Sequence, residues 1–413
     1  MSDKAIWLFA FLAAYWAFCL YWGLAGARTA ASPKSYFLAD RNLPAWIVVA
    51  AGTAITFNGW LFLGHPDIIF HDGFPFAHTG LGAVTIALGS VFFLKRTWML
   101  GKRFGYVTPG EMAGHYFGGE VIRLAMLVVA LVFAIPFVAM QLRISGMILA
   151  GLAGGGIGGD VAMWVLTIVV FGYVGFGGMR AAAYVGTLQG VLMVAGIVAV
   201  GAYAYWLMGG FGAFTEALGQ LSLAGSAGNP PLVTFPYFEI SGVIQYTAGL
   251  GVETPAGGIW TAVMIFSYCL ALMGLALNPI VSVFVFSSRS PKGFAAQATW
   301  ASAGLMGGVL LAFPVAQGLG ILFLGGSEAV SATGIALGDT FAVVPIPGAS
   351  GIVGAYVASL GASAPWFAAL FAVCAVAAVQ AIAAISASAT STLIVRDTPY
   401  RRYPPSRRPR RAR

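Results

Sequence analysis

Long apolar stretches recur along the whole chain, with short polar segments between them. An α-helix rises about 1.5 Å per residue, so roughly 20 apolar residues are needed to cross a hydrocarbon layer about 30 Å thick. The pattern therefore predicts an all-α polytopic membrane protein with about nine transmembrane helices. The predicted spans cover residues 5–25, 45–70, 79–95, 120–150, 161–178, 185–209, 259–286, 297–325 and 364–394.

Composition excludes a water-soluble fold. Of the 413 residues, 59% are hydrophobic and 8% are charged, and the mean hydropathy is +0.88. Soluble domains average roughly 25% charged residues. The spans contain no convergent nucleophile, acid–base pair or HExxH-type metal motif. We therefore expect no enzyme activity, no organic cofactor and no metal site.

The basic residues occupy alternate loops between the predicted spans. They are Lys34 and Arg41, residues 95–103, Arg180, residues 289–292 and residues 396–413. Cytoplasmic loops carry an excess of Lys and Arg. The pattern predicts an exterior amino terminus and a cytoplasmic carboxyl terminus in the inner (cytoplasmic) membrane of a bacterium. We interpret the basic tail as a topology signal beside the lipid bilayer and expect no nucleic-acid partner.

Helix-breaking residues interrupt two of the spans. They are Asn58–Gly59 and Gly64–Pro66 in the second span, and Gly274 and Asn278–Pro279 in the seventh. Within a membrane, such breaks persist only where protein or a water-filled cavity satisfies the freed backbone groups. The two spans hold corresponding positions in two five-helix halves, and paired broken helices indicate a transport site.

These boundaries divide the chain into five parts. They are an extra amino-terminal helix with its cytoplasmic loop (1–44), a first five-helix repeat (45–209), an extracellular loop (210–258), a partial second repeat of three helices (259–395) and a basic cytoplasmic tail (396–413). A second long exterior loop is expected over residues 326–363.

Several segments resemble the sodium:solute symporter family. They are SYFLADRNLPAW (35–46), FNGWLFLGHPD (57–67), FVAMQLRISGMIL (137–149), GGMRAAAYVGTLQGVLM (177–193), NPIVSVFVFSSRSPKGFAAQ (278–297) and ISASATSTLIVRD (385–397). The resemblance implies a leucine-transporter-type fold with two inverted repeats of five helices. It also implies a substrate bound midway across the membrane and a rocking motion that exposes it to each side.

Two features depart from the family pattern. Family members continue past the eighth core helix, where this chain stops, so we expect an incomplete second repeat. Either a second membrane chain supplies the missing helices, or the chain is a remodelled member that no longer transports.

The second departure concerns sodium, which the family holds with backbone carbonyls of the first core helix and a Ser or Thr pair on the eighth. Ala54 and Phe57 match the carbonyl positions, but Ala381 and Ile382 match the hydroxyl pair. Thr56 stands where some members have Asp. Because Na⁺ requires oxygen ligands, sodium coupling is in doubt, and H⁺ becomes an alternative to Na⁺ as the coupling ion.

The leading hypothesis is a symporter-like secondary active transporter for a small organic solute, a carboxylate or an amino acid. The candidate substrate-binding residues are Thr56, Phe57, Asn58, Gly59, Trp60, Gln141, Arg143, Tyr268 and Asn278. A charge at the depth of Arg143 costs at least about 2.5–3.5 kcal/mol unless it is paired or hydrated. Arg143 therefore either holds a substrate carboxylate or extends to the membrane surface. The alternative hypothesis is a non-transporting membrane subunit or sensor built on the same scaffold.

Five titratable residues gather near the exterior end of the second span. They are His65, Asp67, His71, Asp72 and His78. Their spacing matches no zinc motif, so solvated or capping roles are the main interpretation. His65 and Asp67 are the candidates for proton handling.

Overall fold

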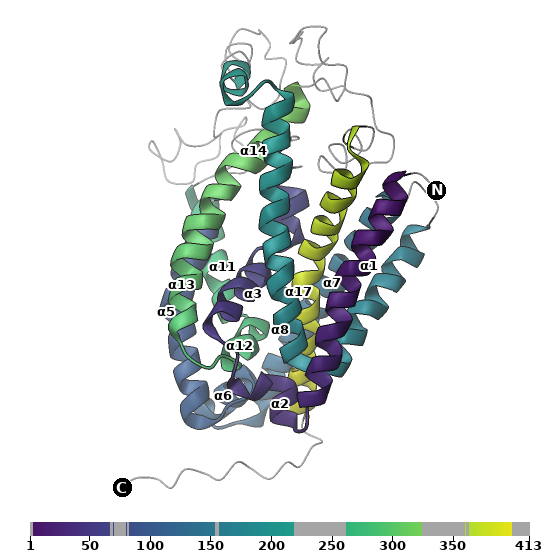
Figure 1. The fold of residues 1–413 in the computed structure, drawn as a ribbon. Helices are drawn as coiled ribbons and strands as arrows, with labels where there is room; N and C mark the ends of the chain where they lie inside the picture. Colours follow the sequence, from purple (N-terminus) through teal and green to yellow (C-terminus); the bar gives the residue numbers. More distant parts are fainter. Residues whose placement is uncertain are drawn as a thin grey trace.

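Helices that run along one common direction make up almost all of the described chain (Figure 1). The computed structural model describes residues 3–66, 69, 80, 82–152, 157–218, 262–323, 360 and 363–398. The long helices are α1 (Asp3–Thr29), α3 (Ala45–Thr56), α5 (Gly82–Phe104), α7 (Glu120–Leu152), α8 (Gly159–Leu207), α11 (Ala262–Gly274), α14 (Gly307–Phe323) and α17 (Pro365–Asp397). Shorter elements are α2 (Pro33–Leu38), η1 (Ala39–Arg41), η2 (Trp60–Gly64), α6 (Pro109–Phe117), η4 (Leu275–Leu277), α12 (Pro279–Phe286), α13 (Lys292–Ala296) and η5 (Gln297–Met306).

Every predicted span contains helix in the described residues, so the all-α membrane fold is confirmed. Seven described helices are long and apolar enough to cross a membrane. One of them, α8, has 49 residues and contains two of the predicted spans. The second predicted span is the broken segment formed by α3 and η2. Most of the expected exterior loops 210–258 and 326–363 lies outside the described residues.

The connection between the fifth and sixth spans was predicted wrongly. Residues 179–184 are helical, and the chain turns at Gly178 alone, where φ is 59° and ψ is −151°. A Cβ atom on Gly178 would lie 2.4 Å from the Tyr36 carbonyl oxygen. Glycine alone tolerates this backbone conformation together with this close contact. The turn between the two helical parts of α8 therefore takes one residue, Gly178, and no separate loop.

The third span is longer than predicted. Helix α5 continues from the predicted end at residue 95 through Lys102 and Arg103 to Phe104. Long basic side chains extend the end of a membrane helix because their alkyl parts lie along apolar surface while the charge reaches water. In α5 the Lys102 ammonium lies over the Trp98 ring, 5.5 Å from its centroid.

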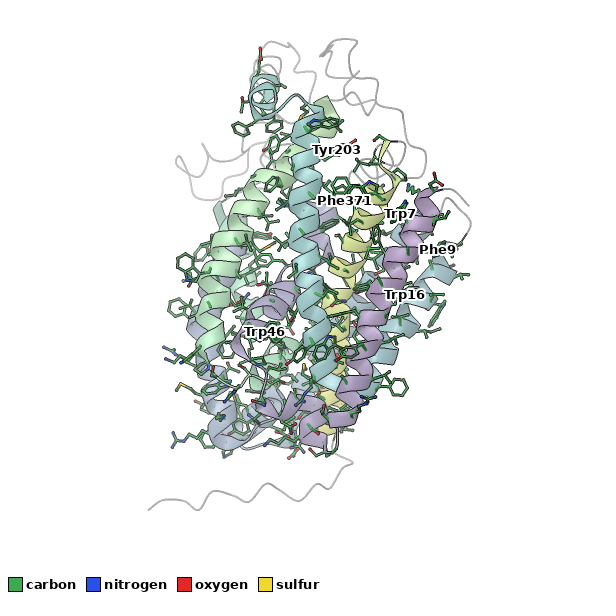
Figure 2. All side chains as sticks on the ribbon, viewed as in Figure 1. Trp7, Phe9, Trp16, Trp46, Tyr203 and Phe371 are labelled. Carbon is green, nitrogen blue, oxygen red and sulfur yellow. The ribbon has the colours of Figure 1, made fainter. Side chains whose placement is uncertain are left out.

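Helix α17 is the centre of the bundle. In its most apolar window, 89% of the residues are buried, and it packs against α1, α7 and α8 (Figure 1). Its buried side chains are mostly Ala and Val. Small side chains let membrane helices approach closely and gain dispersion energy, which replaces the hydrophobic effect inside lipid. Outward-facing positions carry large apolar groups such as Trp7 and Trp46 (Figure 2), which are 44% and 58% exposed.

One end of the bundle, here called the basic end, holds α2, α6 and the last turn of α17 (Figure 1). Two sets of contacts fix it. In the first, Leu43 and the residues after α12 pair through backbone hydrogen bonds, Leu43 N to Ser287 O at 3.1 Å and Arg289 N to Leu43 O at 2.9 Å. Arg41 donates to the Gly101 and Tyr106 carbonyls at 2.9 and 2.6 Å. Burial lowers the pKa of Arg41, and the Glu111 carboxylate opposes this shift.

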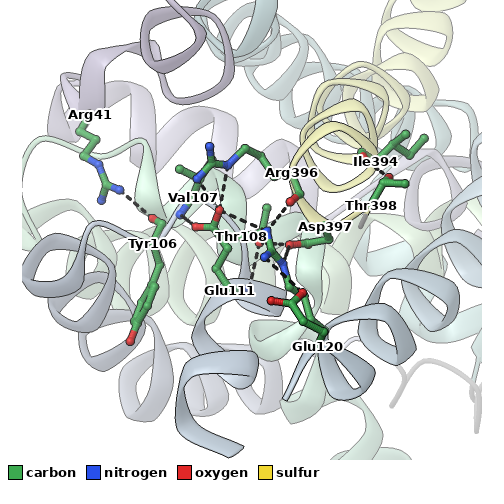
Figure 3. Close-up of polar contacts among 11 residues, drawn as sticks. Arg41, Tyr106, Val107, Thr108, Glu111, Glu120, Ile394, Arg396, Asp397 and Thr398 are labelled. Atoms are coloured by element: carbon green, nitrogen blue, oxygen red, sulfur yellow. Dashed lines mark hydrogen bonds and ion pairs between the residues drawn. The ribbon is translucent and has the colours of Figure 1, made fainter. Parts of the chain in front are cut away.

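The second set is an ion-pair network that joins α6, α7 and α17 (Figure 3). Asp397, at the end of α17, accepts hydrogen bonds from Thr108 Oγ1 and Arg123 Nε, both at 2.8 Å. Arg396 Nε donates to Glu111 Oε1 at 2.8 Å. These contacts connect segments nearly 300 residues apart in the sequence, and they hold the beginning of α7 against the end of α17.

Candidate functional site

The first candidate helix break lies where α3 ends. Helix α3 stops at Thr56, and Phe57 has φ −110° and ψ 88°, outside the helical region. The chain resumes as the π-helical turn η2. A Cβ on Gly59 would lie 2.2 Å from Val379 Cγ2 and 2.8 Å from Val379 Cα, so only glycine lets this segment approach α17.

The second break separates α11 from α12. Helix α11 tightens into the 3₁₀ turn η4, and Asn278 then leaves the helical region with φ −53° and ψ 134°. A residue before proline disfavours the helical conformation because the proline ring clashes with its backbone. Pro279 therefore forces the break at Asn278 and begins α12. The Asn278 side chain caps α12 by accepting a hydrogen bond from Ile280 N at 2.9 Å.

Both breaks border one cavity of about 560 Å³. Its walls come from α3, α5, α7, η4, α12 and α17 and from the junction of α13 with η5. No described lining residue is charged, and the polar ones are Thr56, Asn58, Ser90, Asn278 and Gln297. The Thr56 hydroxyl donates to the Gly52 carbonyl at 2.8 Å. An apolar wall with a few polar groups is typical of a small-molecule site.

The broken helices line the cavity mainly with the halves that lead to the basic end. These are α3 before the first break and α12 after the second, and Leu275 and Ala276 of η4 add lining just before the second break. No described residue of η2, α11 or α14 lines it. On the other side, Phe62 of η2 is 1% exposed. A Cβ on Gly196 would lie 2.6 Å from the Phe62 ring and 2.8 Å from Cys374 Cβ. Phe62, Gly196 and Cys374 are therefore closely packed on this side.

Three of the predicted substrate-binding residues, Thr56, Asn58 and Asn278, line the cavity. Phe57 is fully buried beside it and does not line it. Gly59 faces α17. The side chain of Trp60 lies outside the described part of the structure.

The other three predicted residues do not line the cavity. Gln141 is fully buried in α7, and its carboxamide has no hydrogen-bond partner among the described residues. Arg143 is exposed three residues after the lining residue Met140, a spacing that puts both on one helix face. Tyr268 lies in α11 near the first turn of α5, where a Cβ on Gly82 would come within 3.9 Å of its hydroxyl.

The predicted ion positions are close to the first break and apolar. Ala54, Phe57 and Ala381 are fully buried, and Ile382 lines the cavity. Methyl and butyl groups at Ala381 and Ile382 provide no oxygen ligand for a hard cation. No group of His, Cys, Asp or Glu suited to a metal ion occurs within the described ranges. Of the five titratable residues near the exterior end of the second predicted span, the structure describes His65, which is fully buried, and the other four lie outside the described residues.

Two polar residues of the lining, Ser90 and Gln297, were not among the site residues predicted from the sequence. Gln297 had a weak signal, because it is a lone amide at the beginning of a predicted apolar span. Ser90 had none, since single serines are common in membrane helices and often bond to their own helix. Which of these polar groups reach a cavity depends on the packing of α5 and η5 against α3.

A model of the sodium:solute symporter family matches residues 36–403. The chain belongs to this family. Among curated proteins, the high-affinity proline transporter PutP of Bacillus subtilis is 30% identical over 186 residues, which are 43% of this chain and 38% of the relative. The monocarboxylate transport permease protein of Rhizobium johnstonii is 23% identical over 185 residues, 45% of this chain and 37% of the relative. The matched segments thus span less than half of these relatives.

The fold is similar to that of a solved family structure, described as the substrate-bound outward-open state of a Na⁺-coupled sialic acid symporter. The TM-score is 0.72 at 16% identity, over 95% of this chain and 73% of that chain. At this identity the likeness shows the fold alone. It confirms the predicted leucine-transporter-type bundle.

Proposed function

We propose that this chain is a symporter-like secondary active transporter of a small organic solute. The observation that carries the proposal is the meeting of two broken membrane helices at one cavity. Breaking a helix inside lipid leaves peptide groups without partners, which costs several kcal/mol per group unless protein, water or a ligand satisfies them. A bound solute with polar groups offers that satisfaction in the middle of the membrane.

The lining supports a solute with an apolar body and a polar end. Apolar side chains form most of the described wall, and no charged one is among them. The beginning of α12 lies at the break, and a helix N-terminus favours a negative group. A small carboxylate or a neutral amino acid fits this chemistry. The printed names of the two curated relatives, a proline transporter and a monocarboxylate permease, agree with this class.

The position of the cavity supports alternating access. The positive-inside rule places the basic end in the cytoplasm. In that orientation the half-helices that contribute most of the broken-helix lining lead to the cytoplasm, and Phe62 is packed against Gly196 and Cys374 on the exterior side. Uptake then requires a second arrangement in which Phe62 leaves Gly196 and Cys374.

Two coupling ions are compatible with the fold. Family membership supports Na⁺. The hydrocarbon side chains of Ala381 and Ile382 support H⁺, because a proton needs no shell of oxygen ligands. Imposing a Na⁺ gradient and a proton gradient in turn would show which ion drives uptake.

The test is uptake of radiolabelled L-proline and L-lactate by the purified chain in liposomes. We expect accumulation of at least one solute that requires an inward gradient of Na⁺ or H⁺, and loss of that uptake in Asn58→Ala. The matched control is Asn42→Ala, since Asn42 is exposed and does not line the cavity. Uptake would also show that the chain needs no second membrane chain. Folded protein that accumulates neither solute under either gradient would refute the proposal and favour the subunit or sensor alternative.

A further inference from the structure

Gln297 is the first residue of η5, and it lines the cavity on the basic side of the breaks. It is 4% exposed, and its Nε2 is buried without a hydrogen-bond partner among the described residues. The other lining polar side chains at the breaks differ from it. The Thr56 hydroxyl donates to Gly52, and Asn278 Oδ1 accepts from Ile280 N. The amide donor of Gln297 is therefore not satisfied by the described part of the protein.

An unpaired amide at this position is costly. Leaving a buried polar group without a partner costs about 1–3 kcal/mol, and an apolar residue of the same shape avoids that cost. Most of the other residues that line the cavity are apolar. A ligand that hydrogen-bonds to the amide would recover the cost when the cavity is occupied.

The Gln297 side chain packs closely against α3. Opposite it lies Gly52 of α3, where a Cβ would come within 3.3 Å of Gln297 Cγ and 3.8 Å of the Phe284 ring. Any larger residue at position 52 would press on the glutamine side chain. In addition, η5 is π-helical from Gln297 to Met306, a geometry that is rare and frequent at functional sites.

We propose that Gln297 is a second polar anchor for the transported solute, on the path between the helix breaks and the basic end. The ligand is a small carboxylate or neutral amino acid. On binding, the Gln297 carboxamide turns toward the cavity and donates its amide hydrogens to the carboxyl oxygens of the ligand, whose apolar body lies against Phe284 and Phe294, which also line the cavity. This inference rests on the proposed function and adds a specificity-determining residue to it. Polyhydroxylated solutes are excluded by this arrangement because the wall has too few hydrogen-bonding partners for their hydroxyl groups.

The experiment measures KM and kcat for L-proline and L-lactate uptake in liposomes. We expect Gln297→Leu to raise KM at least about tenfold for the transported solute, with folded protein and kcat changed much less. Gln297→Glu should impair uptake further at neutral pH, since two carboxylates would face each other. Gly52→Ala should raise KM as well, because its methyl group displaces the amide. The matched control is Gln317→Leu, which removes another buried amide; Gln317 donates to the Ile197 carbonyl at 3.0 Å and does not line the cavity.

The outcomes separate this inference from the proposed function. Wild-type uptake with an unchanged KM in Gln297→Leu overturns the inference and leaves the transport proposal standing. A rise in KM that is equal in Gln317→Leu also overturns it, because the effect would then come from general loss of packing. A wild type that transports neither solute refutes both. Should Gln297→Leu fail to fold, Gln297→Asn provides the same test, because it keeps the amide but shortens its reach by one methylene.

Discussion

Replacing Arg123 by alanine should destabilise the basic end of the bundle. The Arg123 side chain is 22% exposed, and its Nε donates to Asp397 Oδ1 at 2.8 Å, while the Asp397 side chain is only 1% exposed. Arg123→Ala would leave that carboxylate buried with Thr108 as its remaining donor. Removing one partner of a buried ion pair costs about 3–5 kcal/mol, because the other charge stays desolvated and unpaired.

The pair that Arg123 forms with Glu120 adds little to this figure. Its contact with Glu120 is 3.6 Å long, and the Glu120 side chain is 78% exposed. Exposed pairs are worth about 0–1 kcal/mol because water and salt screen them. The control Glu120→Ala should therefore cost less than about 1 kcal/mol. The loss of folding free energy expected for Arg123→Ala is several times larger.

The assay is thermal unfolding of the purified protein in detergent, followed by tryptophan fluorescence and by the loss of the monodisperse peak in size-exclusion chromatography. Arg123→Ala should lower the apparent melting temperature several times more than Glu120→Ala. The double variant Arg123→Ala/Asp397→Asn should recover part of the loss, since a neutral amide is cheaper to bury than an unpaired carboxylate. Equal melting temperatures for Arg123→Ala and Glu120→Ala would refute the reasoning. No recovery in the double variant would refute the role given to the buried charge.

Two further predictions concern the side of the breaks where Phe62 packs against Gly196 and Cys374. Gly59→Ala should prevent correct packing and lower the yield of folded protein, because its Cβ would lie 2.2 Å from Val379 Cγ2. The control Gly175→Ala should leave the yield unchanged, since a Cβ there would have nothing within 4 Å. Equal yields of the two variants would contradict this prediction. Cys374 is 4% exposed behind Phe62. In a background whose other cysteines are serine, it should resist a membrane-impermeant maleimide at rest and react faster when solute and gradient are present. Fast labelling that is independent of both would show that this side is not closed.

Local chemistry explains what the sequence alone determined. A helix in lipid must be apolar and about 20 residues long, so hydropathy was sufficient to locate the spans. The breaks were also predictable, because Pro279 restricts Asn278 through covalent geometry whatever surrounds it. For the same reason the family motifs, which contain these breaks, led to the correct fold.

The tertiary structure alone decided which polar side chains meet. Gln141 and Gln297 are both lone amides in apolar helices, yet only Gln297 lines the cavity. The direction of a side chain is set by how its helix is rotated against its neighbours. In the membrane interior that rotation depends on close packing of small residues, such as Gly59 against Val379, rather than on hydrophobicity, since every helix face there is apolar. Which parts of the broken helices line the cavity depends on the same packing, so no local pattern in the chain predicts it.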